Sequence, residues 1–398
     1  MTLAKIYQER RLAVSGVLPN KPIVISAFSA MQQTNDSAGP FVQESNFFWL
    51  TGITEPDWQL IIFNKKSWLV APEKTDIQRI FDGGLSNQQA TAISGVSDVV
   101  SAGEYRGVLE NLAVKSETVF TILKHPHAKY FDFVLNPAIQ KTRNQLKQIF
   151  KNVEDCRLQL ARLKAIKSEA EIASIQSAID SSIVGFEAVR KLLKTAKYEY
   201  QLEAQLSYSF RFEGTDGHAY QPIVGTEKNA CTLHYIENND PLPVNGTVLI
   251  DAGARVNGYA ADITRTYAIG KPSQREKDVH REVEKAHRAI IELIQPGTLL
   301  KDYQEAVDVI MKQALKNLGL LKKPSDYRRY FPHAISHGLG IDVHDSLGGY
   351  DSFQPGMVLT VEPGIYIPEE SIGVRIEDDI LVTDDGHRNL SAALPTSL

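Results

Sequence analysis

The sequence predicts an α/β (α+β) protein of two domains, a mixed α/β domain over residues 1–160 and a second domain over 161–398. The chain has 398 residues, more than the roughly 250–300 over which one core usually grows. In its first part, short apolar runs alternate with helical segments, which is typical of a sheet covered by helices. From about Arg162, long amphipathic segments replace this alternation.

Short apolar runs predict the strands of the first domain. We expect strands over 21–28, 59–63, 67–72 and 118–123. Helical segments lie between or after them, and the sequence predicts helices over 87–94 and 144–155.

The second domain begins with a predicted helix over 164–193. Its apolar side chains recur at helical spacing, at Ile172, Ile175, Ile179, Ile183 and Phe186. Three further helices are expected over 200–214, 275–294 and 301–319, the last of them ending at a glycine. Strand-rich segments are expected after the helix over 200–214, at 246–270, and after the helix over 301–319, at 356–383.

Composition and charge exclude several classes of protein. The chain has 43 Lys and Arg against 48 Asp and Glu and no dense basic cluster, so we expect no nucleic-acid partner. No apolar stretch approaches the roughly 18–20 residues that a bilayer requires, and the N-terminal residues lack the apolar core of a secretory signal. Cys156 and Cys231 are too few for a disulfide framework or a cysteine-ligated zinc site, which favours a cytoplasmic location.

Two aspartates are predicted to project from the same face of a β-hairpin. Asp251 follows an apolar strand, and Asn257-Gly258 is the preferred pair for a type I′ turn. Counting back from that turn places Asp251 opposite Thr264. Asp251 and Asp262 then project from the same face as diagonal neighbours, about 7–8 Å apart or somewhat less.

Such a carboxylate pair is a candidate metal site. Two close carboxylates among apolar strand residues repel each other, and a multivalent cation offsets that repulsion. The alternative is that one aspartate is a turn acceptor and the other pairs with Arg255 or Arg265.

Three histidines and two glutamates add further candidate ligands. His333, His337 and His344 lie within twelve residues of a wider segment that contains several glycines, and imidazole suits a transition metal. Glu362 and Glu377 lie inside strongly apolar strands that form a second hairpin, where a carboxylate is unexpected. The alternative for each glutamate is solvent exposure on a sheet edge.

These residues together could bind two cations. The set comprises four carboxylates and one imidazole: Asp251, Asp262, His337, Glu362 and Glu377. Two divalent cations can share bridging carboxylates and activate one hydroxide between them at neutral pH. No nucleophile elbow or phosphate-binding loop competes with this interpretation.

The chain resembles the metallopeptidases of the pita-bread (creatinase/aminopeptidase) fold, the group of aminopeptidase P, prolidase and methionine aminopeptidase. The resemblance rests on DAG…NGYAADITRTY, HAISHGLGIDVHD, TVEPGIY and RIEDDILVT, in that order. The segment QESNFFWLTGITEPDWQLII is similar to the N-terminal domain of aminopeptidase P and prolidase, which methionine aminopeptidases usually lack. The resemblance therefore implies an N-terminal creatinase/prolidase-like domain and a C-terminal pita-bread metallopeptidase domain.

The resemblance also implies roles for the ligands. Asp251 would bind one metal, His337 and Glu362 would bind the other, and Asp262 and Glu377 would bridge both. Glu362 would in addition be the catalytic general base or proton carrier.

Five further residues are implied to act on the substrate. His234 and His344 would contact the substrate and stabilise the developing oxyanion. His333 and Arg375 would lie near the proline pocket, with Tyr366 assisting Arg375.

The activity implied is hydrolysis of the N-terminal Xaa-Pro peptide bond, with peptides that carry proline in second position as substrates. The cofactors would be two divalent ions with a hydroxide between them, Mn²⁺ first and Co²⁺, Zn²⁺ or Fe²⁺ as alternatives. The protein would form a homodimer or homotetramer. Three alternatives stay open: a prolidase that cleaves Xaa-Pro dipeptides, a creatinase-like carbon–nitrogen hydrolase without a metal, and a non-catalytic binding protein of the same fold.

Overall fold

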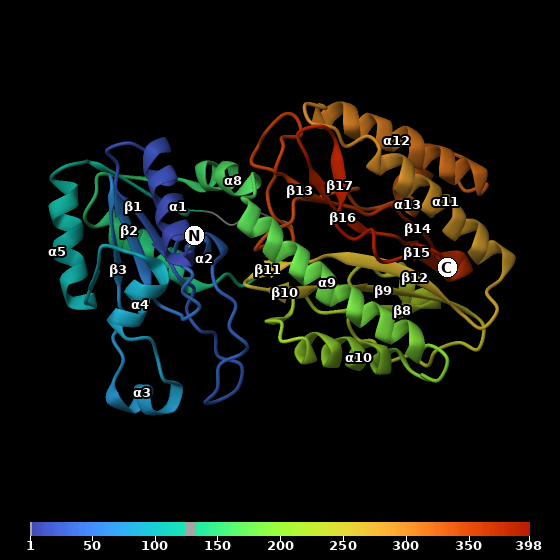
Figure 1. The fold of residues 1–398 in the computed structure, drawn as a ribbon, viewed down its shortest axis with the longest axis horizontal. Coiled ribbons are helices and arrows are strands. Elements are labelled where there is room, and N and C mark those ends of the chain that lie inside the picture. Colours follow the sequence, from blue (N-terminus) through green and yellow to red (C-terminus); the bar gives the residue numbers. More distant parts are fainter. Residues whose placement is uncertain (1, 124–132) are drawn as a thin grey trace. The chain divides into compact units, whose positions relative to one another are not determined.

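A computed structural model describes residues 2–123 and 133–398. The chain divides into two compact units, Met1–Leu163 and Lys164–Leu398 (Figure 1). The division falls inside helix α8 (Arg157–Ala165). No helix in the described part of the chain is both long and apolar enough to cross a bilayer.

A six-stranded sheet forms the centre of the N-terminal unit, in the order β4-β3-β2-β1-β5-β6. Neighbours among β1, β2 and β3 are antiparallel, whereas β4, β5 and β6 join by parallel pairs. The strands are β1 (Ile23–Ser26), β2 (Gln59–Phe63), β3 (Lys66–Val70), β4 (Asp98–Val100), β5 (Thr118–Thr121) and β6 (Asn152–Asp155). The four strands predicted for this unit are confirmed.

Among the described residues of this unit, six helices accompany the sheet: α1 (Leu3–Val17), α2 (Ser45–Thr51), α3 (Asp76–Asp82), α4 (Asn87–Ser94), α5 (Ala102–Ala113) and α7 (Pro137–Lys147). Helix α4 is the predicted one. The helix predicted over 144–155 is wrong in its second half, because α7 ends at Lys147 and β6 follows. Leu146, Phe150 and Val153 all pack into one hydrophobic cluster beside the sheet, and β5 supplies the backbone partners of β6.

Helix pairs border the strands of the C-terminal unit (Figure 1). Helices α9 and α10 pack together and contact strands between β7 and β12, whereas α11 packs against α12 and against β13, β14 and β15. The helices are α9 (Glu169–Leu192), α10 (Glu199–Phe212), α11 (Gln274–Ile291), α12 (Leu300–Asn317) and α13 (Asp326–Tyr330), with 3₁₀ turns η1 (Glu227–Cys231) and η2 (Pro368–Glu370). The four long helices match the predicted ones.

Small antiparallel sheets make up the rest of this unit, in the orders β12-β9-β8, β11-β10-β7, β13-β16-β17 and β14-β15. Their strands are β7 (Gly217–His218), β8 (Ile223–Thr226), β9 (Gly246–Ala252), β10 (Ala254–Val256), β11 (Tyr259–Ala260), β12 (Ile263–Ile269), β13 (Val358–Val361), β14 (Gly364–Ile367), β15 (Ile372–Arg375), β16 (Asp378–Val382) and β17 (His387–Asn389).

Two hairpins meet in this unit. The first has the predicted register, since Asp251 pairs with Thr264 and both turn residues, Asn257 and Gly258, have positive φ (51° and 80°). The second is the predicted hairpin of the two glutamate strands, in which β13 pairs with β16 and β14 with β15. A β-bridge between Thr264 and Glu377 joins the two hairpins, so their acidic residues converge.

Candidate metal centre

The two aspartates of the first hairpin lie side by side in a buried position. Asp251 is near the end of β9 and Asp262 directly precedes β12, with 8% and 5% of their surface exposed. The hydroxyl oxygen of Tyr220 lies 2.5 Å from one oxygen of each carboxylate, so the two aspartates share its single donor proton. The second oxygen of Asp251 accepts a hydrogen bond from the Arg375 guanidinium.

The alternative partners of these aspartates are engaged elsewhere. Arg255 donates to the backbone carbonyls of Gly258 and Ile341, and Arg265 forms a buried ion pair with Asp378 at 2.6 Å. The interpretation in which Arg255 or Arg265 neutralises the hairpin aspartates is therefore wrong.

His337 and Glu362 approach Asp262 from a different part of the chain. Nε2 of His337 lies 3.4 Å from Asp262 and 3.5 Å from Glu362. Burial disfavours the charged imidazole, but hydrogen bonding to Asp262 and the negative charges of Glu362 and Asp262 raise the pKa of His337 to about 9. Burial also raises the pKa of Glu362, to about 7, against the opposing effect of His337.

Glu377 completes the group from the second hairpin. Its side chain is 2% exposed, so the alternative of a solvent-facing edge residue is wrong for it. The Thr264 hydroxyl donates to its carboxylate at 2.6 Å. Burial, followed by the charges of Asp262 and Glu362, raises the pKa of Glu377 well above its ordinary value.

Potential ligand atoms converge in overlapping groups. Within each group, one ligand atom per residue lies within 4.8 Å of the others: Asp251, Asp262 and Glu377; His337, Glu362 and Glu377; Asp262, His337 and His344. Four carboxylates lie together with one arginine in this cluster, and burial raises the pKa of three of them. This donor set fits divalent cations, because cations would offset the repulsion between buried carboxylates and because carboxylate and imidazole suit manganese, iron, cobalt or zinc.

A row of hydrogen bonds leads away from Asp251. The Arg375 guanidinium that binds Asp251 also donates to the hydroxyl of Tyr366 at 2.8 Å, and Nε2 of His333 lies 2.9 Å from the same hydroxyl. Burial, followed by the charge of Arg375, lowers the pKa of His333 to about 3, so this imidazole is neutral. The structure therefore brings together the three residues predicted for the proline pocket.

The two remaining histidines differ in their surroundings. The ring of His344 is exposed and packs edge-on against the ring of His337, with 4.4 Å between centroids. His234 lies in an exposed loop after η1, and no hydrogen bond or ion pair found among the described residues joins it to the metal ligands. Its neighbour Tyr235 is buried in a hydrophobic cluster that includes Tyr366, which places this loop beside the row of hydrogen bonds.

Four polar residues of the site were not predicted from the sequence. Tyr220 contacts both aspartates, and the Thr264 hydroxyl donates to Glu377. The Thr360 hydroxyl accepts a hydrogen bond from the backbone N–H of His337 and donates one to Glu362, and Asp379 accepts a hydrogen bond from the backbone N–H of Asp262. Thr264 could have been predicted, because it is the cross-strand partner of Asp251 in the predicted register. Nothing in the sequence around Tyr220 distinguished it from other aromatic residues.

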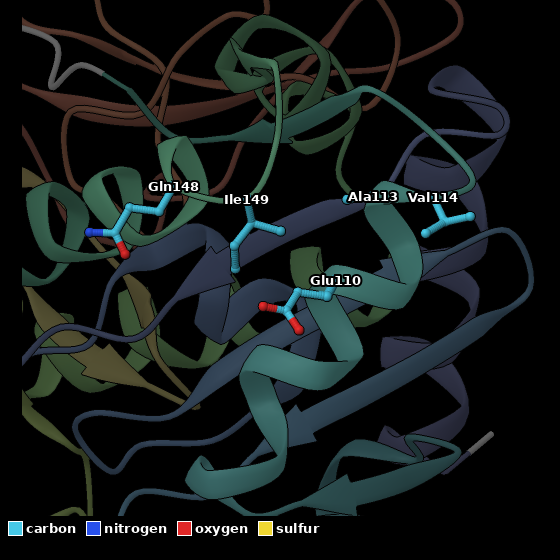
Figure 2. Close-up of a pocket in the computed structure, with 5 residues that line it drawn as sticks. All are labelled: Glu110, Ala113, Val114, Gln148 and Ile149. Atoms are coloured by element: carbon cyan, nitrogen blue, oxygen red, sulfur yellow. The ribbon is translucent and has the colours of Figure 1, made fainter.

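A hollow of about 390 Å³ in the N-terminal unit does not resemble a catalytic site (Figure 2). It is lined by Glu110, Ala113, Val114, Gln148 and Ile149. Glu110 is the only titratable residue of the five, and its carboxylate pairs with Arg106 at 2.8 Å.

Comparisons with known proteins cover both units. The profile of Metallopeptidase family M24 matches residues 144–384, and that of the aminopeptidase P N-terminal domain matches residues 7–120. The chain is 32% identical to the Xaa-Pro aminopeptidase of Haemophilus influenzae, covering 98% of this chain and 95% of that protein.

Two solved structures are similar over the full chain. Proline aminopeptidase P II from Yersinia pestis has a TM-score of 0.85 at 32% identity, covering 100% of this chain and 98% of that one. Aminopeptidase P from Escherichia coli with the inhibitor Pro-Leu has a TM-score of 0.87 at 29% identity, covering 100% and 96%.

Proposed function

The chain belongs to metallopeptidase family M24 and carries the N-terminal domain of aminopeptidase P, and from this premise we propose that it is a metal-dependent aminopeptidase that hydrolyses N-terminal Xaa-Pro bonds. The observation that carries the proposal is the convergence of Asp251, Asp262, His337, Glu362 and Glu377 in overlapping groups of potential ligand atoms. In the proposed domain assignment, residues 1–160 form the N-terminal domain and residues 161–398 the catalytic domain.

Two overlapping ligand groups support two cation positions. Asp251 would bind one cation, and His337 and Glu362 would bind the other. Glu377 belongs to both groups, and Asp262 approaches the ligands of both, so these two carboxylates are proposed to bridge. Mn²⁺ is the cation we propose first, with Co²⁺, Zn²⁺ and Fe²⁺ as alternatives that suit the same donors.

The chemistry that the cations supply when bound is Lewis-acid activation of water and of the scissile carbonyl. The proton transfers are proposed for Glu362, whose pKa of about 7 allows it to accept and release a proton near neutral pH. It would take a proton from the attacking water and deliver it to the leaving prolyl nitrogen.

Histidines would stabilise the charge that develops on the carbonyl oxygen. His344, which lies beside His337, and His234 are proposed to donate hydrogen bonds to that oxygen. Removing one such donor typically lowers turnover by about 10²–10³-fold.

Proline in second position requires a dedicated pocket. The Xaa-Pro bond is a tertiary amide without an N–H, and the pyrrolidine ring fixes the backbone. We propose that His333, Tyr366 and Arg375 form the wall of that pocket, since their hydrogen bonds to each other fix their side chains. The neutral imidazole of His333 suits an apolar ring better than a charged one would.

The test is a rate assay on metal-depleted protein with and without added Mn²⁺. An Xaa-Pro-Xaa tripeptide, an Xaa-Pro dipeptide and an Xaa-Ala-Xaa control are compared at equal concentration. We expect Mn²⁺-dependent release of the first residue from the tripeptide and little reaction with the control. Cleavage of the dipeptide alone would indicate a prolidase instead, and no cleavage of either proline peptide at saturating Mn²⁺ would refute the proposal.

Oligomeric state stays a prediction, with a homodimer or homotetramer expected from the resemblance. Sedimentation equilibrium of the full chain measures it.

A further inference from the structure

A backbone bridge aligns the two histidines of the glycine-rich loop. Gly338 and Asp345 form an antiparallel bridge, in which the Asp345 N–H donates to the Gly338 carbonyl at 2.8 Å. His337 directly precedes Gly338, and His344 directly precedes Asp345. The two imidazole rings therefore lie beside each other, with 4.4 Å between their centroids.

Two buried lysines bind the carboxylate at the end of this loop. Nζ of Lys167 lies 3.2 Å from one oxygen of Asp345, and Nζ of Lys164 lies 3.6 Å from the other. The lysine side chains are only 2% and 5% exposed, although lysine is almost never buried unless it is paired. We call the three residues Lys164, Lys167 and Asp345 the lysine anchor.

The charges of the anchor keep its carboxylate ionised. Burial by itself would raise the pKa of Asp345, but the ammonium groups of Lys164 and Lys167 lower it below its ordinary value. The packing is close, since a Cβ at Gly340 would lie 2.5 Å from a carboxylate oxygen of Asp345. The carboxylate of Asp345 is thus held both by ion pairs and by close packing.

The rest of the loop is fixed by other contacts. The Gly340 carbonyl accepts the N–H of Ala260, and the Ile341 carbonyl accepts a hydrogen bond from Arg255. These bonds hold the middle of the loop without Lys167 or Asp345, although Lys164 also pairs there with the exposed carboxylate of Asp342. His344 lies between that middle part and Asp345, directly before the residue whose carboxylate the lysines bind.

We propose that the lysine anchor positions His344 for the reaction, so that Lys164, Lys167 and Asp345 act on turnover through this histidine. The catalytic part of this inference rests on the proposed function, in which His344 donates to the carbonyl oxygen. None of the three anchor residues belongs to any of the three groups of potential metal ligands. Substitutions in the anchor should therefore leave the metal content unchanged.

The kinetic test uses Lys167→Met, with Asp345→Asn as a second variant in case the first does not fold. We expect kcat on an Xaa-Pro-Xaa tripeptide to fall by about 10- to 100-fold, because small displacements of a catalytic group have effects of that size. KM and bound Mn²⁺ should stay unchanged. Asp342→Asn is the matched control, because Asp342 pairs with Lys164 at 3.3 Å but is 49% exposed, and we expect its kcat to be that of the wild type.

A double-mutant cycle separates positioning from general destabilisation. If the anchor acts through His344, Lys167→Met should lower kcat strongly in the wild type and hardly at all in His344→Ala. An equal fall in both backgrounds would overturn the inference, as would a fall explained by lost metal.

Crystal structures of the metal-free wild type and Lys167→Met provide a readout without activity. We expect the His337–His344 ring separation to change in the variant while the Gly340–Ile341 backbone stays in place. If the wild type cleaves no proline peptide, the proposed function fails, and this comparison still decides the positioning claim. An unmoved His344 would overturn it.

Discussion

Cation binding at the cluster should strengthen as the pH rises from 6 to 8, because two of its ligands must first lose protons. His337, with a pKa of about 9, and Glu362, with a pKa of about 7, both hold protons in the metal-free protein at pH 6. A cation binds the neutral imidazole and the ionised carboxylate, so its affinity is linked to pH. Because the pKa values of both ligands are raised, protons compete with the cation at low pH, and the affinity for the cation rises as the pH rises.

The size of the effect follows from the two pKa values. At pH 7, His337 is almost fully protonated and Glu362 is half protonated, so cation binding should release about 1.5 protons from this pair. Between pH 6 and pH 8 the association constant should rise by about 1,000-fold. Glu377 adds to both numbers, since its pKa is also raised.

The assay is isothermal titration of metal-depleted protein with Mn²⁺, in buffers of different ionisation enthalpy. The dependence of the measured heat on the buffer gives the number of protons released. Glu362→Gln should lower that number at pH 7 by at least about 0.5, whereas the exposed Asp342→Asn should leave it unchanged. Release of less than one proton at pH 7, or an affinity that is flat from pH 6 to pH 8, would refute the reasoning.

Three further predictions concern single residues. Asp262→Ala or Glu377→Ala should abolish activity and lower bound metal together, whereas His234→Ala should lower kcat with metal content intact. Elemental analysis beside the rate assay checks both predictions. Equal metal loss in the two kinds of variant would contradict the separate roles. Thr264→Val removes a buried hydroxyl that binds Glu377 at 2.6 Å and should lower the free energy of unfolding by about 1–3 kcal/mol in urea denaturation, with an unchanged value as the contrary result. Gly253→Ala would place a Cβ 1.7 Å from the carbonyl oxygen of Ala261, so the variant should lose Mn²⁺ binding in the isothermal titration, and retained wild-type affinity would show that the hairpin tolerates it.

The first hairpin could be predicted in register because its determinants are local. Asn257-Gly258 sets the turn, and side chains alternate along each strand, so counting from the turn fixes which residues face each other. The predicted pairing of Asp251 with Thr264 is confirmed. The predicted fold class, an N-terminal α/β domain followed by a pita-bread domain, is confirmed by the family matches.

Contacts between distant segments could not be predicted in the same way. Tyr220 reaches Asp262 across 42 positions of the chain, and Asp379 reaches the same residue across 117. Neither contact has a local pattern, because each joins segments that are far apart in the sequence. The error at 144–155 has a related cause, since the sheet edge at β5 overrides the helical spacing of that segment.

The central claim is that two divalent cations share the cluster of four carboxylates and His337. Anomalous diffraction at the manganese edge, from crystals of the chain soaked in Mn²⁺, tests it directly. The account predicts two peaks about 3.5–4 Å apart, one beside Asp251, one beside His337, and both within reach of Glu377. A single peak, or peaks remote from these side chains, would contradict it.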